Sequence, residues 1–253
     1  MSMIGNDLMA KITGFWFFYR WHPEVALRYL PIAGRINKLK RDVSILEVGS
    51  GGLGIAPYLK RTIIGVDSNF SPPFHPRLKK VKGSATKLPF PDASFNVIIS
   101  VDMLEHLKPK ERIKAIREML RVGKNRVYLA VPCGENSFQQ DLFLSKLYMK
   151  QTGNSYPFLE EQIHLGLPDE KELYDTIRKE AEIKRKKVEV SVFGNENLQV
   201  RSFLMRGFMT RNFIVDVFFR KLLLFAIPIL RFINHEPTYR KLFIIDILSE
   251  NHQ

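Results

Sequence analysis

The stretch Ser44-Ile-Leu-Glu-Val-Gly-Ser-Gly-Gly-Leu-Gly54 decides the fold of this chain. It has the pattern of a short apolar strand that runs into a glycine-rich loop. A second apolar run, Thr62-Ile-Ile-Gly-Val-Asp67, ends in an acid, and helix-length sequence separates the two runs. This order predicts a β-α-β unit with a ligand-binding loop at the carboxyl end of its first strand.

The alternation continues along the rest of the chain. Further strands are expected at 95–101, 126–131, 187–193 and 239–248, and helices at 109–120, 138–150 and 170–182. Such alternation is typical of an α/β fold, a mostly parallel sheet with helices on both faces. We expect residues 1–40 to form an N-terminal helical cap and residues 41–253 one domain, with a basic, apolar helical insertion at 195–238.

Composition limits the class of protein. Of 253 residues, 45% are hydrophobic and 26% charged, which excludes collagen-like and disordered chains. The single cysteine, Cys133, excludes a disulfide framework and a cysteine-based metal site, and it agrees with a reducing compartment. We expect a cytoplasmic protein, because the first residues lack a signal-peptide pattern and charges interrupt the longest apolar region, 203–230.

The glycine loop fits two patterns. Gly49, Gly51 and Gly54 satisfy the G-x-G-x-x-G pattern of dinucleotide-binding loops, and Glu47, Gly49 and Gly51 satisfy an E-x-G-x-G pattern. Asp67, at the end of the second strand, can accept hydrogen bonds from both hydroxyls of a ribose. These residues predict an adenosine-containing ligand and leave NAD and S-adenosylmethionine open; the alternative is a tight turn with a capping acid.

Two later motifs separate these cofactors. They are Gly83-Ser-Ala-Thr-Lys-Leu-Pro-Phe90 and Asp102-Met-Leu-Glu-His106. Together with the glycine loop and Asp67, they make the chain resemble the class I S-adenosylmethionine-dependent methyltransferases, in particular the methyltransferase type 11 family. The resemblance implies a Rossmann-like, doubly wound, seven-stranded sheet whose antiparallel last strand lies beside the sixth, and S-adenosylmethionine as cofactor.

The resemblance also implies the cofactor-binding residues. The methionyl part of the cofactor is expected at Glu47, Gly49, Ser50 and Gly51, and the ribose at Asp67 and Ser68. The adenine is expected near Ser84 and Ala85, and residues Ser100 to Asp102 are expected beside the sulfonium. Most members of the family carry an acid where Ser84 stands. A hydroxyl accepts a hydrogen bond without charge assistance, so we expect slightly weaker binding of the adenine amino group.

Methyl transfer from a sulfonium requires alignment and exclusion of water more than a strong nucleophile. If the acceptor is a hydroxyl, a general base helps, and the candidates are His106 and His164. The competing interpretations are a packing or cofactor-contact role for His106 and a structural role in a loop for His164. No metal site is expected.

Two other methyltransferase chemistries are disfavoured. The Asn/Asp-Pro-Pro-aromatic segment of enzymes that methylate amino groups of nucleic acids does not occur after the fourth expected strand, where the chain reads Val101-Asp-Met-Leu104. Enzymes that methylate cytosine carbon use a cysteine nucleophile. Cys133 follows the fifth strand instead, and we interpret it as a buried or loop cysteine.

The net charge of +13 favours an anionic partner. Residues 201–241 contain eight basic residues and two acids among many phenylalanines. Three interpretations stay open: an amphipathic surface on an anionic membrane, a lid over an apolar substrate, or core packing. Nucleic acid is disfavoured, because the aromatic residues lie among Leu, Ile and Val.

The sequence therefore predicts a methyltransferase for a small or lipid-linked acceptor, in cell-envelope glycan or quinone-type biosynthesis, that associates peripherally with the inner face of the membrane. The alternatives are a noncatalytic membrane-docking or partner-binding module of the same fold, and an RNA methyltransferase. An NAD-dependent oxidoreductase would satisfy the glycine loop alone, but the Leu88-Pro-Phe90 and Glu105-His106 segments disfavour it.

Overall fold

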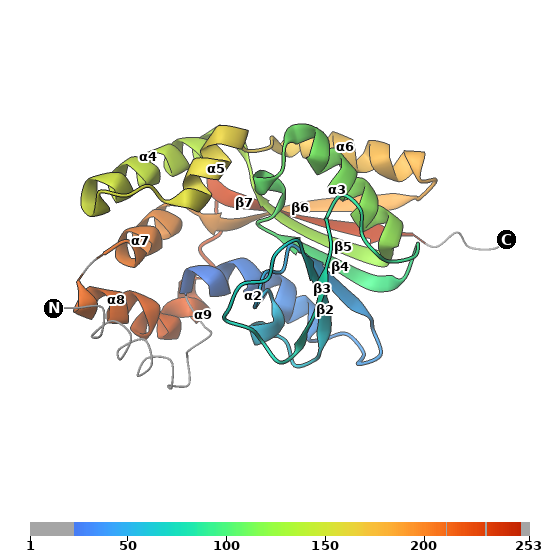
Figure 1. Cartoon of the computed structure of the whole chain (residues 1–253), viewed down its shortest axis with the longest axis horizontal. Coiled ribbons are helices and arrows are strands. Elements are labelled where there is room, and N and C mark those ends of the chain that lie inside the picture. The colour runs from blue at the N-terminus through green and yellow to red at the C-terminus, as the bar shows by residue number, and fades with distance from the viewer. Residues whose placement is uncertain (1–22, 211, 231, 249–253) are drawn as a thin grey trace.

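The computed structural model describes residues 23–210, 212–230 and 232–248 (Figure 1). Most of the expected N-terminal cap, residues 1–22, lies outside the described residues. The rest of it contains α2 (Pro23–Ile36), a helix that buries one apolar face. The domain division expected from the sequence stays a prediction.

One sheet of seven strands organises the molecule. Its order is β3 (Leu78–Lys82), β2 (Ile63–Asp67), β1 (Ile45–Val48), β4 (Phe95–Val101), β5 (Gly123–Pro132), β7 (Thr238–Ile247) and β6 (Val188–Asn197). Strands β1 to β5 pair in parallel, and β7 runs antiparallel to both β5 and β6. The predicted Rossmann-like fold with an antiparallel last strand beside the sixth is confirmed.

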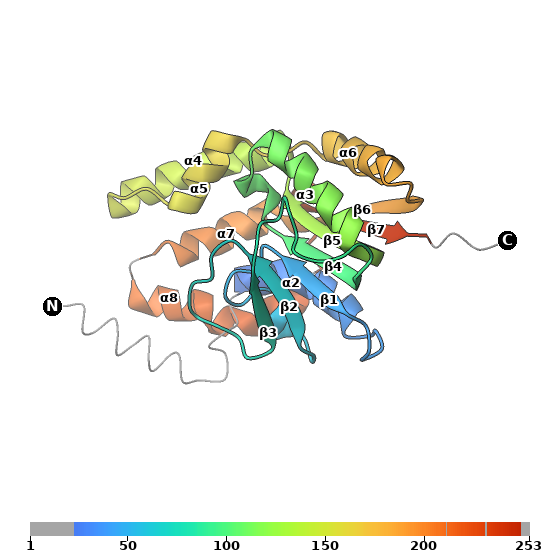
Figure 2. The ribbon, with the colours of Figure 1, turned by 45° about the vertical axis from the view of Figure 1, so that its right-hand side comes forward.

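Helices cover the two faces of the sheet (Figures 1 and 2). On one face, α3 (Pro109–Val122) and α6 (Glu170–Ile183) bury a cluster that includes Ile116 and Ile177. On the other face, α2 packs with the 3₁₀ helix η1 (Ala56–Tyr58) around Ile32 and Ile99. The sheet is therefore the middle layer of a three-layer α/β/α arrangement.

Further helices extend beyond the carboxyl ends of the parallel strands. A separate small cluster joins α4 (Gly134–Thr152), α5 (Pro157–Leu165) and α7 (Leu198–Phe208) through Leu144, Leu159 and Met205. The chain continues through α8 (Phe213–Arg220), η3 (Leu222–Ala226) and α9 (Ile227–Leu230) before β7. Figure 1 shows these helices on one side of the sheet, away from α6.

Two local expectations were wrong. The segment between β1 and β2 contains no α-helix; it turns repeatedly and forms only η1. Four glycines between 49 and 54 explain this, because glycine strongly disfavours helix. After β5 the chain forms two helices where the sequence predicted one at 138–150, since α4 begins at Gly134 and α5 follows it.

None of the described helices has both the length and the apolar character that crossing a membrane requires.

Candidate functional site

The glycine loop folds tightly over the end of β1. Gly54 has φ +49°, and a Cβ atom there would lie 2.0 Å from Oε2 of Glu47, so only glycine fits. Gly49 packs against Met103 and donates its N–H to the carbonyl of Val66, 2.8 Å away. Gly51 also has a positive φ, +53°, but a Cβ atom added there would meet nothing within 4 Å. The loop is therefore open at Gly51.

Asp67 lies beside this opening. Its Oδ2 accepts the N–H of Gly51 at 2.8 Å, and its Oδ1 accepts the N–H of Asn69 at 3.0 Å. The residue is half-buried, and Ser68 next to it is exposed. Each carboxylate oxygen has two lone pairs, so Asp67 can accept further hydrogen bonds from the two hydroxyls of a ribose.

Glu47 does not face the opening. It is 1% exposed, and both carboxylate oxygens accept the N–H of Ile55, at 3.0 and 2.9 Å. Burial raises the pKa of Glu47 to about 8, although hydrogen bonds from Ile55 and Tyr29 oppose the shift. In the structure this side chain holds the loop from within, and its expected contact with a methionyl group stays a prediction.

The remaining predicted cofactor residues lie at the carboxyl ends of neighbouring strands. Ser84 is exposed after β3, and its hydroxyl accepts the N–H of Thr86 at 3.2 Å. Ala85 is half-buried, whereas Ser50 and Ser100 are buried. The hydroxyl of Ser100 has no hydrogen-bond partner among the described residues. The order β3-β2-β1-β4 brings these positions to one edge of the sheet.

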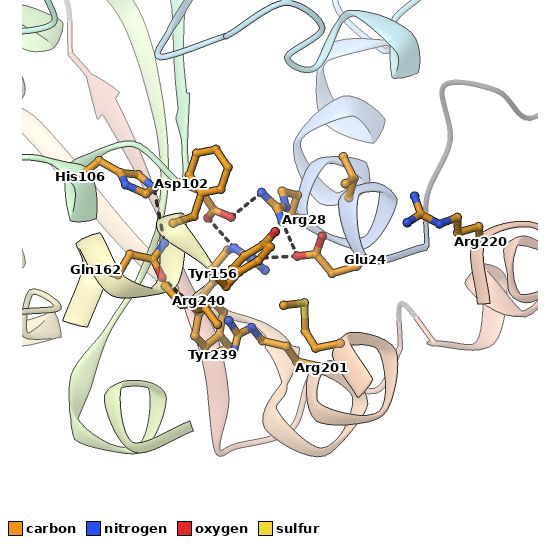
Figure 3. A pocket seen from close by; sticks show the side chains of 14 residues that line it. Glu24, Arg28, Asp102, His106, Tyr156, Gln162, Arg201, Arg220, Tyr239 and Arg240 are labelled. Carbon is orange, nitrogen blue, oxygen red and sulfur yellow. Dashed lines mark hydrogen bonds and ion pairs between the residues drawn. The ribbon is translucent and has the colours of Figure 1, made fainter. Parts of the chain in front are cut away.

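A cavity of about 430 Å³ begins where this edge reaches β4 (Figure 3). Its volume is within the range of small-molecule sites, roughly 300–1,000 Å³. Residues from α2, α5, α7, α8 and β7 complete its wall. The lining residues are Glu24, Val25, Arg28, Asp102, His106, Tyr156, Phe158, Leu159, Gln162, Arg201, Met205, Arg220, Tyr239 and Arg240.

Arg240 of β7 holds one wall of the cavity together. It is 1% exposed, and its guanidinium pairs with Asp102 at 2.5 Å, with Glu24 at 3.4 Å and with Glu196. Asp102 also pairs with Arg28 of α2 at 2.9 Å. The acids overcome the effect of burial and raise the pKa of Arg240 well above its ordinary value.

Two of these acids have unusual backbone conformations. Asp102 has φ +49° and Glu196 has φ +65°. A residue other than glycine in this region costs on the order of 1–3 kcal/mol and persists where its surroundings enforce it. Arg240 pairs with both side chains. The ion pairs therefore hold two strained corners, one after β4 and one at the end of β6.

A second buried pair lies deeper, between α4 and α7. Arg201 donates to Asp141 at 2.8 Å and to Gln140 at 2.7 Å. Its guanidinium lies over the ring of Tyr239, 3.4 Å from the centroid, and the hydroxyl of Tyr239 donates to Asp141 at 3.0 Å. These contacts fix α7 against the end of β7.

The two candidate histidines have different positions. His106 lines the cavity, and its Nδ1 lies 2.7 Å from the carboxylate of Glu161. His164, in the last turn of α5, is exposed and is not among the lining residues. Its expected base or substrate role therefore has no support from its position, and His106 is the histidine that can reach a molecule in the cavity.

Two other groups near this edge are buried and have raised pKa values. Glu105 is fully buried, and its carboxylate oxygens have no hydrogen-bond partner among the described residues. Burial and the nearby Asp102 raise its pKa well above its usual range. Burial likewise raises the pKa of the Cys133 thiol, so this residue is not a thiolate nucleophile.

The sequence did not identify the arginines of the cavity. Arg28, Arg201 and Arg240 lie on separate elements, and isolated charges in apolar surroundings were the only signal. Arg201 was counted within the basic insertion and Arg240 within a strand. Long-range ion pairs that join residue 24 to residue 240 leave no local spacing pattern.

The shifted pKa of Glu47 gives a testable pH dependence. The folded chain binds this proton more tightly than the unfolded chain. The stabilisation of the folded state by the protonated carboxyl is therefore complete below the ordinary pKa of 4.5 and is lost as the pH rises to about 8. Glu47→Gln mimics the protonated carboxyl. We expect it to melt with the wild type near about pH 5 and several degrees above it at about pH 9.

The exposed substitution Asp42→Asn is the control, and it should shift the melting temperature little at either pH. Thermal unfolding followed by circular dichroism measures all three proteins. Equal melting temperatures of Glu47→Gln and the wild type at both pH values would contradict the assignment.

Comparison with known proteins shows a similarity to methyltransferases. A family model described as a methyltransferase domain matches residues 46–131. Probable S-adenosylmethionine-dependent methyltransferases of two Mycobacterium tuberculosis strains, CDC 1551 / Oshkosh and H37Rv, are 32% identical over 128 residues. The match covers 47% of this chain and 43% of each relative. The aligned part thus spans less than half the length of these curated relatives.

Solved structures share the fold. One is the chain solved in complex with the Trm112 methyltransferase activator of Haloferax volcanii, with a TM-score of 0.52, 14% identity, and coverage of 99% of this chain and 97% of that chain. Another is Haemonchus contortus phosphoethanolamine N-methyltransferase 2 in complex with S-adenosylmethionine, with a TM-score of 0.52, 16% identity, and coverage of 87% and 52%. Residues 46–131 thus match a methyltransferase domain, and the four sequence motifs and the strand order make the chain similar to the class I S-adenosylmethionine-dependent methyltransferases.

Proposed function

We propose that this chain transfers a methyl group from S-adenosylmethionine to a small-molecule acceptor bound in the cavity beside Asp102 and His106. The observation that carries the proposal is the position of this cavity. It opens at the carboxyl end of β4, the strand that pairs with β1 and its glycine loop. Donor and acceptor sites on adjacent strand ends suit a direct transfer between two bound molecules.

The glycine-loop edge fits an adenosyl ligand. The open space at Gly51 lets a ligand approach the backbone, and Asp67 offers a half-buried carboxylate for the ribose hydroxyls. Ser84 offers a hydroxyl in place of an acid near the expected adenine. Glu47 contributes by holding the loop through Ile55.

S-adenosylmethionine supplies a methyl group that is already activated by the positive sulfonium. The chain then has to orient the acceptor, exclude water and remove a proton where the acceptor is a hydroxyl. We propose His106 as the base. Glu161, 2.7 Å from Nδ1, can fix the ring and favour a proton on that nitrogen. Nε2, which lies 3.4 Å from the side-chain amide of Gln162, is then the proton acceptor once the methyl acceptor replaces that amide.

The direct test is transfer of label. The purified chain is incubated with methyl-labelled S-adenosylmethionine and a small-molecule extract of the source cells. We expect label in extracted small molecules with the wild type and much less with Asp67→Ala when the cofactor concentration is below saturation. Separation into water-soluble and organic-soluble fractions distinguishes a polar acceptor from a lipid-linked one. If the wild type binds the cofactor and transfers no label, a noncatalytic module is favoured.

Asp67 should control cofactor affinity. Asp67→Ala removes a charged acceptor from the ribose site, so we expect binding of S-adenosylhomocysteine to weaken about tenfold or more. Calorimetric titration measures the dissociation constant. The matched control is Asp175→Ala, which removes an exposed carboxylate from the outer surface of α6. Equal affinities of Asp67→Ala and the wild type would contradict the ribose assignment.

His106 should control turnover and not cofactor affinity. With the acceptor that the labelling experiment identifies, His106→Gln is expected to lower kcat by about a hundredfold or more, as loss of a general base does. The affinity for S-adenosylhomocysteine should stay unchanged. His164→Gln, an exposed histidine outside the cavity, is the control. A His106→Gln variant with wild-type kcat would contradict the role of a base.

We propose in addition that α8, η3 and α9 contact an anionic membrane, which would suit an acceptor that carries a lipid. Ile214 is 77% exposed, Leu222 is 55% exposed and Ile229 is 70% exposed. Exposed apolar side chains on short helices, with a chain charge of +13, favour an interfacial position. The lipid-linked acceptor in cell-envelope glycan or quinone-type biosynthesis stays a prediction.

Vesicle flotation tests the membrane contact. Ile214→Asp combined with Ile229→Asp should abolish binding to vesicles of phosphatidylglycerol and phosphatidylcholine. The reason is that two apolar side chains that would insert into the membrane are replaced by charges that the anionic surface repels. Ile183→Asp, at the end of α6 and 55% exposed, is the control on another surface. Undiminished flotation of the double variant would contradict the proposal.

A further inference from the structure

The carboxylates among the described lining residues of the cavity already form ion pairs with arginines. Two carboxylates line it, those of Glu24 and Asp102. Each of them is paired with both Arg28 and Arg240. A cationic ligand would have to displace one of these arginines to reach a carboxylate. The chemistry of the lining therefore disfavours a positively charged group in this part of the cavity.

The other acids that pair with the arginines do not line the cavity. Glu196, Asp141 and Asp216 each pair with a lining arginine, and these three acids are not among the lining residues that the structure describes. The arginines themselves face the cavity: Arg28, Arg201, Arg220 and Arg240. The described lining therefore contains four arginines and two carboxylates, and the three remaining acids of the network lie outside it.

Two arginine nitrogens are available as donors. Nε of Arg28 and Nε of Arg201 are buried, and neither has a hydrogen-bond partner among the described residues. Arg201 as a whole is only 3% exposed. A buried donor without a partner costs about 1–3 kcal/mol, and more when it belongs to a charged group. An anionic oxygen of a ligand would remove this cost.

Both guanidinium groups keep their charge. Burial opposes the charge on Arg28, but Glu24 and Asp102 outweigh it and raise its pKa above the ordinary value. Around Arg201, Tyr239 and Asp141 have the same effect against burial. The donors are therefore charged over the whole range of pH in which the protein would work.

Four of the other described lining residues are apolar. Val25, Phe158, Leu159 and Met205 belong to α2, α5 and α7. In Figure 3, Arg28 and Arg201 lie on either side of Tyr156, and His106 lies beyond Asp102. This arrangement suits an organic molecule with an acidic group more than a free inorganic anion.

We propose that the methyl acceptor carries a carboxylate or phosphate group that binds to Arg28 and Arg201, with its apolar part against α5 and α7 and its reacting atom toward His106. The inference rests on the proposed methyl transfer, because it names the class of acceptor for the same cavity. It concerns binding of the acceptor, which is measured without turnover.

The test compares three probes of equal chain length: octanoate, octyl phosphate and the uncharged octanamide. Each is titrated into the full chain saturated with S-adenosylhomocysteine, and ligand-observed NMR gives the dissociation constants. Arg28→Gln removes one free donor. Arg201→Lys removes the Nε donor. It keeps a positive charge beside the buried Asp141, which limits the loss of stability. Arg117→Gln removes a partly exposed arginine that pairs with Glu180 between α3 and α6, outside the cavity, and it is the control for loss of an arginine charge elsewhere.

We expect the wild type to bind octanoate or octyl phosphate about tenfold or more tightly than octanamide, since a charge-assisted hydrogen bond is worth about 1.5–3 kcal/mol. The anion that binds identifies carboxylate or phosphate as the source. Arg28→Gln and Arg201→Lys should lose most of this preference, while Arg117→Gln keeps it. If Arg201→Lys does not fold, Arg28→Gln decides.

Equal binding of octanamide and the anions, absence of anion binding, or an unchanged preference in Arg28→Gln would overturn the proposal. These results leave binding of S-adenosylhomocysteine intact. Failure of the proposed function has a different signature, since there S-adenosylhomocysteine itself does not bind or the labelling experiment yields no product. The two failures are therefore distinguishable.

Discussion

The acceptor side of the molecule depends on one buried guanidinium, that of Arg240. Its partners come from three other elements: Glu24 of α2, Asp102 after β4 and Glu196 at the end of β6. Removal of one partner from such a buried network leaves an uncompensated charge, which typically costs about 3–5 kcal/mol. The elements are therefore tied to one arrangement, in which α2 and the corner before α7 close over the carboxyl ends of the strands. The cavity follows from that closure.

The two halves of the site are built by different means. At the glycine loop the backbone dominates: Gly54 makes room for Glu47, and the N–H of Gly51 orients Asp67. In the cavity, side chains dominate, because arginines from α2, α7 and β7 meet there. The first half suits a ligand that a whole family shares, and the second half suits a ligand particular to this chain. Asp102 belongs to both halves of the site, since it directly follows β4 and pairs with Arg28 and Arg240.

This difference explains how far the sequence could predict the protein. The α/β class follows from local apolar periodicity, and the seven-stranded sheet with its antiparallel last strand is what the resemblance to the methyltransferase family implies; both predictions were confirmed. The segment after β1 was expected to be helical, but its glycines and the capping by Glu47 favour a tight turn. The ion pairs of Arg240 join residues that are 44, 138 and 216 positions apart in the chain, so no local pattern could reveal them. His106 and His164 looked alike as titratable residues, and only the fold separates the lining histidine from the exposed one.

The most direct test of the account is a crystal structure of the chain with S-adenosylhomocysteine. The account predicts the ribose hydroxyls on Asp67, the backbone of Gly51 against the ligand, and the sulfur facing the cavity beside Asp102 and His106. A ligand whose sulfur faces away from this cavity, or one that binds elsewhere on the sheet, would contradict the claim that the cofactor edge and the arginine-lined cavity form one active site.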